Sequence, residues 1–162
     1  MILLDTHIVI WLAFEPDRLS KCAKEAIRAA RVQDGLAIAA ITLMGLAWLA
    51  ENGRVETKLG VESFVRRCAS KMTVLPITPE IAARAASLPE PYPSDFRDRL
   101  IGATALVEGI QLVTHDKQIK KSGMIPVIWW LVRVGCPRSL AFGDLRDNGE
   151  LAPHNTRMGR LG

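Results

Sequence analysis

The chain of 162 residues is long enough for one domain with its own hydrophobic core, and a hydrophobic content of 49% excludes an intrinsically disordered chain. No apolar run is long enough to cross a membrane and no signal peptide is visible, so we expect a cytoplasmic protein without a membrane partner. The net charge of +4 is compatible with a nucleic-acid partner, but a charge of this size does not by itself predict one.

Short apolar runs alternate with helical patterns along most of the chain. The strands expected from these runs are Met1–Leu4, Leu36–Ile41, Thr73–Ile77, Ile110–Thr114 and Ile125–Trp129. Four helices have a predicted N-cap, which is Ser20 for a helix to Val32, Thr42 for Leu43–Asn52, Thr78 for a helix to Leu88, and Asp95 for a helix to Glu108. Further helical segments are expected at Ile8–Phe14, Val61–Ser70 and Lys117–Lys121. This alternation predicts an α/β fold, with a parallel sheet and helices on both of its faces.

The last part of the chain has a different composition. Gly, Pro, Arg and Asn are scattered from Val132 to Gly162 without a helical or strand period. We therefore divide the chain into a folded domain over residues 1–129 and a poorly ordered C-terminal extension over residues 130–162.

Three aspartates are expected at one edge of the sheet. Asp5 follows the first strand and Asp116 follows the strand Ile110–Thr114, so both lie at the carboxyl edge of a parallel sheet. Asp98 lies in the first turn of a helix whose preceding loop must return to the same edge. Three carboxylates in one place repel one another unless a hard cation such as Mg²⁺ binds them. The pattern therefore predicts a metal site that activates water for phosphodiester cleavage.

Each aspartate also has a purely structural explanation. Asp5 fits the N-cap of the helix after the first strand, and Asp116 fits an Asx turn. Asp98 stands three residues after Asp95, so this pair fits a variant of the capping box. The joint position of the three aspartates at one edge favours a site over three unrelated local roles.

The stretches that carry these aspartates resemble one protein family. They are Met1-Ile2-Leu3-Leu4-Asp5-Thr6-His7, Asp98-Arg99-Leu100-Ile101-Gly102-Ala103-Thr104-Ala105-Leu106 and Leu112-Val113-Thr114-His115-Asp116. In this order and spacing they are similar to PIN-domain proteins, specifically to the VapC-type toxins of bacterial toxin–antitoxin pairs. The segment Ile125–Trp129 looks like the usual ending of that family, so the resemblance covers essentially residues 1–129.

This resemblance implies a three-layer α/β/α sandwich and an endoribonuclease that depends on Mg²⁺ or Mn²⁺. It also implies an RNA substrate, a homodimer and a cognate VapB-like antitoxin that silences the enzyme. By position, Asp5, Asp98 and Asp116 match the acidic metal-site residues of the family. The supporting positions are Thr6, Arg99, which matches the basic residue after the helix Asp, and Thr114, which matches the polar residue at the strand end.

The chain departs from the family pattern at one acidic position. The family usually has a Glu in the helix after the second strand, where this chain has Gly45. Glu51 lies six residues later, about 240° round a helix of ~3.6 residues per turn, so we expect it to face elsewhere. In addition, either Phe96 replaces a common proline or the loop before it is shortened, and Asp98 keeps its role under both alignments.

These departures leave a second hypothesis open. In this hypothesis the chain is a decayed toxin that folds and binds RNA or an antitoxin but cleaves RNA weakly or not at all. Loss of one carboxylate lowers the negative charge that holds cations, so we expect one weak Mg²⁺ site. The exposed part of the apolar helix Leu43–Asn52 is a candidate face for dimerisation or for the antitoxin. Candidate phosphate contacts are Arg66, Arg67, Lys71, Arg97, Arg99, Lys117, Lys120 and Lys121.

Overall fold

Strands and helices alternate in the computed structural model, which describes residues 1–129. The strands are β1 Ile2–Leu4, β2 Leu36–Ala39, β3 Thr73–Leu75, β4 Gln111–Val113 and β5 Val127–Ile128. The helices are α1 Thr6–Phe14, α2 Lys21–Val32, α3 Ala40–Glu51, α4 Val61–Ala69, α5 Pro79–Ser87, α6 Phe96–Glu108 and α7 Lys117–Ser122. A short 3₁₀ helix, Pro16–Arg18, follows α1 and was not expected from the sequence. The extension predicted for residues 130–162 lies outside the described residues.

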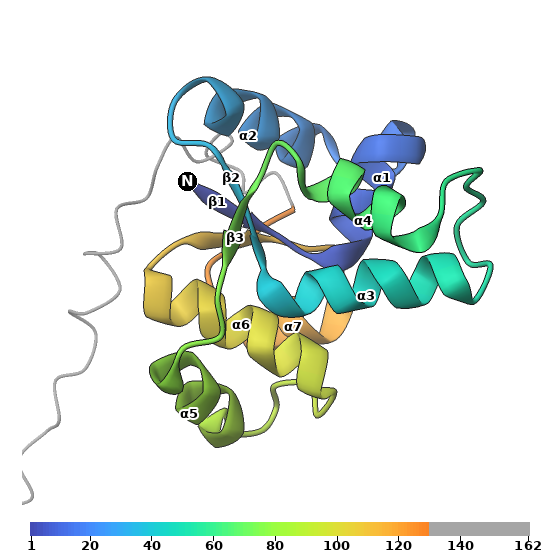
Figure 1. The fold of residues 1–162 in the computed structure, drawn as a ribbon. Coiled ribbons are helices and arrows are strands. Elements are labelled where there is room, and N and C mark those ends of the chain that lie inside the picture. Colours follow the sequence, from blue (N-terminus) through green and yellow to red (C-terminus); the bar gives the residue numbers. More distant parts are fainter. Residues whose placement is uncertain (130–162) are drawn as a thin grey trace, which may run out of the picture.

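The five strands form one parallel sheet in the order β3-β2-β1-β4-β5 (Figure 1). The first strand is therefore central, and Leu3 is in register with Ala37 on one side and with Leu112 on the other. All three residues of β1 are buried, as expected for a strand that is covered on both faces. The strand order also brings the carboxyl ends of β1 and β4 next to each other.

Alternate side chains of the strands enter two separate cores, one on each face of the sheet. The first core includes Ile2 and Leu4 of β1, Ile8 of α1, Ile27 of α2 and Phe64 of α4. The second core includes Leu3 of β1, Leu112 of β4, Ile101 of α6 and Ile119 of α7. Helix α5 packs on α6 through Ile81, Ala85 and Ala103. The predicted α/β/α sandwich is confirmed, and no helix of residues 1–129 is long and apolar enough to cross a membrane.

Three of the four predicted N-caps are confirmed. The Ser20 side chain accepts a 3.1 Å hydrogen bond from the Ala23 N–H at the start of α2. The Thr78 side chain accepts a 3.3 Å hydrogen bond from the Ile81 N–H at the start of α5. Asp95 caps α6 in the same way. These caps satisfy N–H groups that have no partner within their own helix.

The fourth predicted cap, Thr42, is wrong. The strand β2 ends at Ala39 and α3 begins at Ala40, so no loop separates the two elements. Thr42 therefore lies inside the first turn of α3, where it is fully buried. Its hydroxyl has no hydrogen-bond partner in the described part of the chain. Because the strand passes directly into the helix, the sheet fixes where α3 starts.

Candidate active site

The pairing of β1 with β4 joins two of the predicted site positions. Leu4 is in register with Val113, so Asp5 and Thr114 leave their strands side by side. The Thr114 hydroxyl donates a 2.6 Å hydrogen bond to Asp5 Oδ2. Asp5 occupies the N-cap position of α1, but its side chain makes no capping hydrogen bond. Thr114 therefore orients Oδ2, and the Asp5 side chain does not cap α1.

Thr114 also holds Asp116 in place. Its hydroxyl oxygen accepts a 3.0 Å hydrogen bond from the Asp116 backbone N–H. Asp116 caps α7, because its Oδ1 accepts hydrogen bonds of 2.7 and 2.8 Å from the N–H groups of Gln118 and Ile119. The structural role expected for Asp116 is thus confirmed, and it uses one carboxylate oxygen. The other oxygen, Oδ2, has no hydrogen-bond partner among residues 1–129.

Asp98 reaches the site from the first turn of α6, which is held by several polar contacts. The Asp95 carboxylate accepts hydrogen bonds from the N–H groups of Arg97 at 2.9 Å and Asp98 at 3.4 Å. The Arg97 guanidinium binds the same carboxylate through Nε and Nη2, both at 3.2 Å. The hydroxyl of buried Tyr92 donates a 3.0 Å hydrogen bond to the Asp98 carbonyl oxygen. These contacts fix the backbone from which the Asp98 carboxylate projects.

Burial and like charge disfavour the ionised form of two of the three carboxylates. Burial raises the pKa of Asp5, while the hydrogen bond from Thr114 and the charge of His7 oppose this rise. Burial also raises the pKa of Asp98 to about 7, and the negative charges of Asp5 and of two further aspartates add to the rise. The carboxylates therefore lie close enough to repel one another, and a bound cation would relieve this repulsion.

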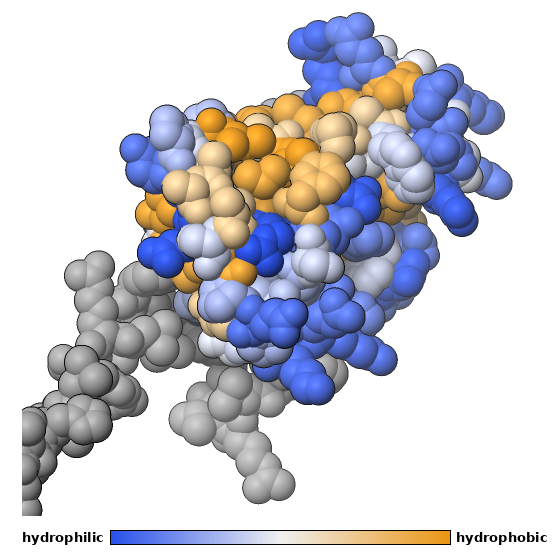
Figure 2. All heavy atoms as spheres, turned by 90° about the horizontal axis from the view of Figure 1, so that it is seen from below, coloured by the Kyte–Doolittle hydropathy of each residue, from blue (hydrophilic) through white to orange (hydrophobic). Residues whose placement is uncertain are grey.

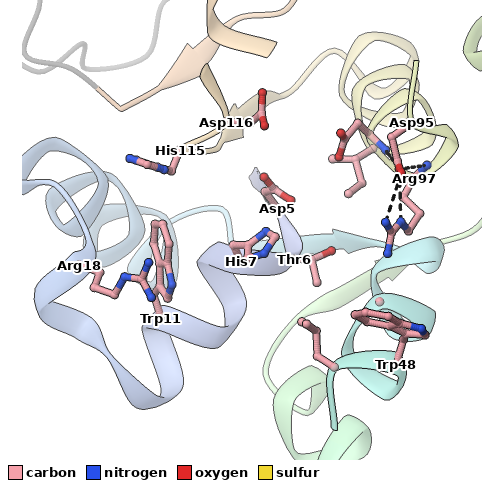
Figure 3. Close-up of a pocket in the computed structure, with 14 residues that line it drawn as sticks. Asp5, Thr6, His7, Trp11, Arg18, Trp48, Asp95, Arg97, His115 and Asp116 are labelled. Carbon is pink, nitrogen blue, oxygen red and sulfur yellow. Dashed lines mark hydrogen bonds and ion pairs between the residues drawn. The ribbon is translucent and has the colours of Figure 1, made fainter. Parts of the chain in front are cut away.

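One pocket of about 550 Å³ collects these groups (Figure 3). The residues that line it are Asp5, Thr6, His7, Trp11, Arg18, Gly45, Trp48, Leu49, Asp95, Arg97, Asp98, Ile101, His115 and Asp116. The three predicted aspartates and Thr6 are all among them. Thr114 is fully buried and acts on the pocket through its hydrogen bonds to the two neighbouring aspartates.

The donor set of the pocket fits a hard divalent cation in its chemistry. Carboxylate oxygens are the ligands that Mg²⁺ and Mn²⁺ prefer. Among residues 1–129, however, no three His, Cys, Asp or Glu side chains are gathered closely enough to hold an ion by themselves. Mg²⁺ commonly retains several waters and contacts only one or two carboxylates. The chemistry of these carboxylates therefore suits a partly hydrated ion rather than a closed protein cage.

Arg99 does not line the pocket. Its guanidinium donates hydrogen bonds to the carbonyl oxygens of Ala85 at 2.8 Å, Ala86 at 3.2 Å and Leu88. These carbonyl groups lie at the end of α5, whereas Arg99 belongs to the first turn of α6. Arg99 therefore ties two helices together and supports Asp98 by positioning α6, without contact with the other predicted site residues.

Gly45 lines the pocket at the position where the acidic residue was expected. A Cβ atom at Gly45 would lie 3.1 Å from Thr6 Cγ2 and 3.3 Å from Thr6 Oγ1. Thr6 therefore occupies the space directly in front of this position. Glu51 is exposed and does not line the pocket, which agrees with the expectation that it faces elsewhere. No other acidic residue of α3 replaces the missing carboxylate.

Sequence reasoning missed several aromatic and basic side chains of the pocket. The guanidinium of Arg18 lies 4.3 Å from the ring centroid of Trp11, and the His115 ring meets the same indole edge-on at 5.3 Å. His7 and Trp48 are exposed and also line the pocket. The histidines follow Thr6 and Thr114 directly in the sequence, and this adjacency was a usable signal. Arg18 and Trp48 have no such neighbour in the sequence.

The sequence of the chain matches a known protein family. Residues 2–123 match the PIN domain. The chain belongs to the PIN-domain family. This PIN domain is 44% identical over 119 residues to Ribonuclease VapC22 of Mycobacterium tuberculosis (strain ATCC 25618 / H37Rv), and the alignment covers 74% of this chain and 89% of that relative. The predicted resemblance to VapC-type proteins is therefore confirmed.

Solved structures with the same fold come from toxin–antitoxin systems. The PIN domain superposes on a chain of a toxin–antitoxin complex from Klebsiella pneumoniae with a TM-score of 0.57 and 27% identity, over 79% of this chain and 96% of that chain. It superposes on a chain of VapBC2 from Rickettsia felis, bound to a DNA fragment from their promoter, with a TM-score of 0.62 and 18% identity. The second match covers 80% of this chain and all of that chain, and at this identity it shows the fold alone.

Proposed function

We propose that this PIN domain is a metal-dependent endoribonuclease toxin of the VapC type, which cleaves RNA phosphodiester bonds and is neutralised by a VapB-like antitoxin. The observation that carries the proposal is the convergence of Asp5, Asp98 and Asp116 on one pocket, with Thr114 bonded to two of them. The 44% identity to a ribonuclease, over most of both chains, supports the same activity here.

In this proposal Asp5, Asp98 and Asp116 hold one Mg²⁺ or Mn²⁺ ion. When bound, such an ion would supply a polarised water and would stabilise negative charge on the leaving oxygen. Thr114 keeps the Asp5 carboxylate oriented by donating to Oδ2. Tyr92 and the Asp95 cap keep the first turn of α6 in place, so the backbone that carries Asp98 is held in position.

A second candidate function rests on Gly45. The pocket has three carboxylates where the family usually has four, so the charge that attracts cations is lower. Under this alternative the chain retains the fold and binds RNA or the antitoxin, but it cleaves RNA weakly or not at all. The two functions differ in whether the carboxylates of Asp5, Asp98 and Asp116 suffice for catalysis.

An apolar groove away from the pocket offers a surface for the antitoxin. It lies between α3 and α4 and is lined by Leu43, Ala47, Val61, Val65, Ala69 and Val74, with Glu62 and Arg66 beside them. Figure 2 shows that apolar side chains also gather on one face of the molecule, framed by hydrophilic residues. We propose that an apolar segment of a VapB-like antitoxin docks in the groove, as helices dock in hydrophobic grooves elsewhere.

Two further aspects of the proposed toxin concern its assembly and its location. Phe96 and Val107 of α6 are 55% and 41% exposed, and a second copy of the chain packed on this helix would cover both side chains. We propose that two copies of the chain form a homodimer that covers such side chains. We also propose that the toxin acts in the cytoplasm, where its RNA substrates are present.

The proposal is tested by incubating the purified full chain with labelled total RNA in Mg²⁺, Mn²⁺ or EDTA. We expect cleavage with either metal and none in EDTA. Asp5→Asn should reduce cleavage at least about 100-fold, because metal-assisted stabilisation of the transition state is worth several kcal/mol. Circular dichroism checks that the variant is folded.

Two variants of Gly45 separate the two candidate functions. Gly45→Glu restores a carboxylate, and Gly45→Gln adds a side chain of the same size without the charge. Cleavage by the unmodified chain that is lost in Asp5→Asn supports the working nuclease. Cleavage by Gly45→Glu alone supports the decayed toxin. If neither the unmodified chain nor Gly45→Glu cleaves RNA with either metal, the nuclease proposal is wrong.

A further inference from the structure

The side walls of the pocket carry groups that the proposed carboxylate chemistry does not use. Figure 3 shows Arg18 and Trp48 on opposite sides of Asp5. The side chain of Arg18 is 55% exposed and Trp48 is 49% exposed, so neither belongs to the core. A ligand that lies across the carboxylates would therefore meet a guanidinium on one side and an indole on the other.

Trp48 offers an open aromatic surface at the rim of the pocket. Gly45 precedes it by about one helical turn on α3, so the two residues share a face of the helix, and both line the pocket. Gly45 adds no side chain to this face of the helix, and the nearest side chain to its Cβ position is that of Thr6. Half-exposed aromatic rings are the surfaces on which proteins stack unpaired nucleobases.

Arg18 is held in a fixed orientation on the opposite wall. Its guanidinium lies over the ring of buried Trp11, and its Nη1 binds the Glu15 carboxylate at 3.1 Å. Its Nε and Nη2 atoms have no acceptor within residues 1–129. A guanidinium that is stacked on an aromatic ring keeps its in-plane N–H groups available, and their geometry suits phosphate oxygens.

We infer that an RNA strand crosses the pocket between these two walls, with a nucleobase stacked on the indole of Trp48 and a backbone phosphate bound to the guanidinium of Arg18. This inference rests on the proposed function, because it places the scissile phosphate between the two contacts, over the carboxylates. Stacking requires an unpaired base, so the preferred substrate is single-stranded RNA. Since every base has an aromatic face, these two contacts select strandedness rather than sequence.

The position of Trp48 favours RNA over a protein partner as its ligand. Met44 is also exposed on α3, one turn before Trp48, but it does not line the pocket. A protein interface along α3 would involve both side chains, whereas an RNA strand in the pocket contacts Trp48 alone. Met44→Ala is therefore a matched control for Trp48→Ala. Arg28→Ala is the control for Arg18→Ala, because Arg28 is an exposed arginine of α2 that does not line the pocket.

The test measures RNA binding in the Asp5→Asn background, where the probe stays intact. The probe is a short, fluorescein-labelled single-stranded RNA of mixed sequence, and its anisotropy is measured at several salt concentrations. We expect Trp48→Ala to weaken binding about 10-fold without a change in the salt dependence, and Trp48→Phe to retain most of the affinity. We expect Arg18→Ala to weaken binding and to lower the slope of log Kd against log salt by about 0.7.

Met44→Ala and Arg28→Ala should bind the probe like their parent. Unchanged RNA affinity in Trp48→Ala and Arg18→Ala would overturn the inference, and so would a parent that binds no RNA. A Trp48→Ala protein with normal RNA affinity but an altered oligomeric state by light scattering would assign Trp48 to a protein interface instead. Because binding is measured without cleavage, the inference and the proposed function can fail separately. If RNA binding depends on Trp48 and Arg18 but the unmodified chain does not cleave RNA, the nuclease activity is refuted and the binding inference stands.

Discussion

The two helices that border the pocket, α3 and α6, are held in place by different kinds of contact. The first turn of α6 is held by the Asp95 cap, by the Arg97 guanidinium bound to the Asp95 carboxylate and by the Tyr92 hydroxyl. The first turn of α3 has no side-chain cap, and the hydroxyl of buried Thr42 has no hydrogen-bond partner in the described residues. Polar contacts therefore position α6, whereas the sheet and apolar packing position α3.

This difference explains how the chain tolerates the loss of an acidic residue on α3. The Thr6 side chain lies next to the Cβ position of Gly45, so the absence of a side chain there leaves no open gap on that side. On α6, the backbone N–H and carbonyl groups of Asp98 are bonded to the Asp95 carboxylate and the Tyr92 hydroxyl. Side chains on the α3 wall of the pocket can thus be replaced with little loss of stability. On the α6 wall, the hydrogen bonds of the first turn restrict such replacements.

The largest effect is expected from Arg99, which ties α6 to the end of α5. Arg99→Ala should lower the free energy of unfolding by about 2–4 kcal/mol, because it removes charge-assisted hydrogen bonds to backbone carbonyl groups, two of which are partly buried. Arg99→Lys should recover less than half of this loss, since one ammonium group cannot reach the same three acceptors. Urea denaturation measures both values. An effect below about 1 kcal/mol for Arg99→Ala would contradict the role of Arg99 as a link between the helices.

A smaller contrast is expected between the glycines of the two helices. A Cβ at Gly102 of α6 would collide with the Tyr92 hydroxyl and with Ile125 Cδ1, so Gly102→Ala should lower the free energy of unfolding by about 1–3 kcal/mol. At Gly45 of α3 the neighbour is the half-exposed Thr6 side chain, which can move. Gly45→Ala should therefore leave stability unchanged or raise it by up to about 1 kcal/mol through helix propensity. Equal effects in urea denaturation would remove the proposed difference between the helices.

The smallest effect concerns two buried threonines. Thr42→Val on α3 should raise the free energy of unfolding by about 1 kcal/mol, because it removes a buried hydroxyl that has no partner within the described residues. Thr104 on α6 is the matched control, since its hydroxyl donates a 2.7 Å hydrogen bond to the Leu100 carbonyl. Thr104→Val should lower stability by about 0.5 kcal/mol. Thermal melts of both variants give the sign, and a lower melting temperature for Thr42→Val would show that its hydroxyl has a partner after all.

The fold and part of the site follow from rules that act along the sequence. Buried strands and helix caps are local patterns, so the alternation of elements was predictable, and parallel strands place their carboxyl ends at one edge. This rule alone is enough to predict that Asp5 and Asp116 lie at the same edge. The resemblance to the PIN family added Thr114, and the structure shows its hydroxyl between the two aspartates.

Other features depend on neighbours that the sequence does not reveal. Thr42 has the right residue type for a cap, but only the structure shows that β2 continues into α3 without a loop. Arg99 follows the family pattern, yet its partners are carbonyl groups of another helix. Arg18 and Trp48 face the pocket because of how the 3₁₀ helix after α1 and the helix α3 pack, and neither residue forms part of a sequence motif.

The hydrogen bond between Thr114 and Asp5 also sets the moment at which the pocket first exists during synthesis. Asp5 leaves the ribosome at the start of translation, but its partner follows 109 residues later. The central strand β1 remains open on that side until β4 has been made and has paired with it. In a nascent chain, or in one truncated before β4, Asp5 therefore has no Thr114 to orient it. The complete pocket can form only when synthesis of the domain is nearly finished.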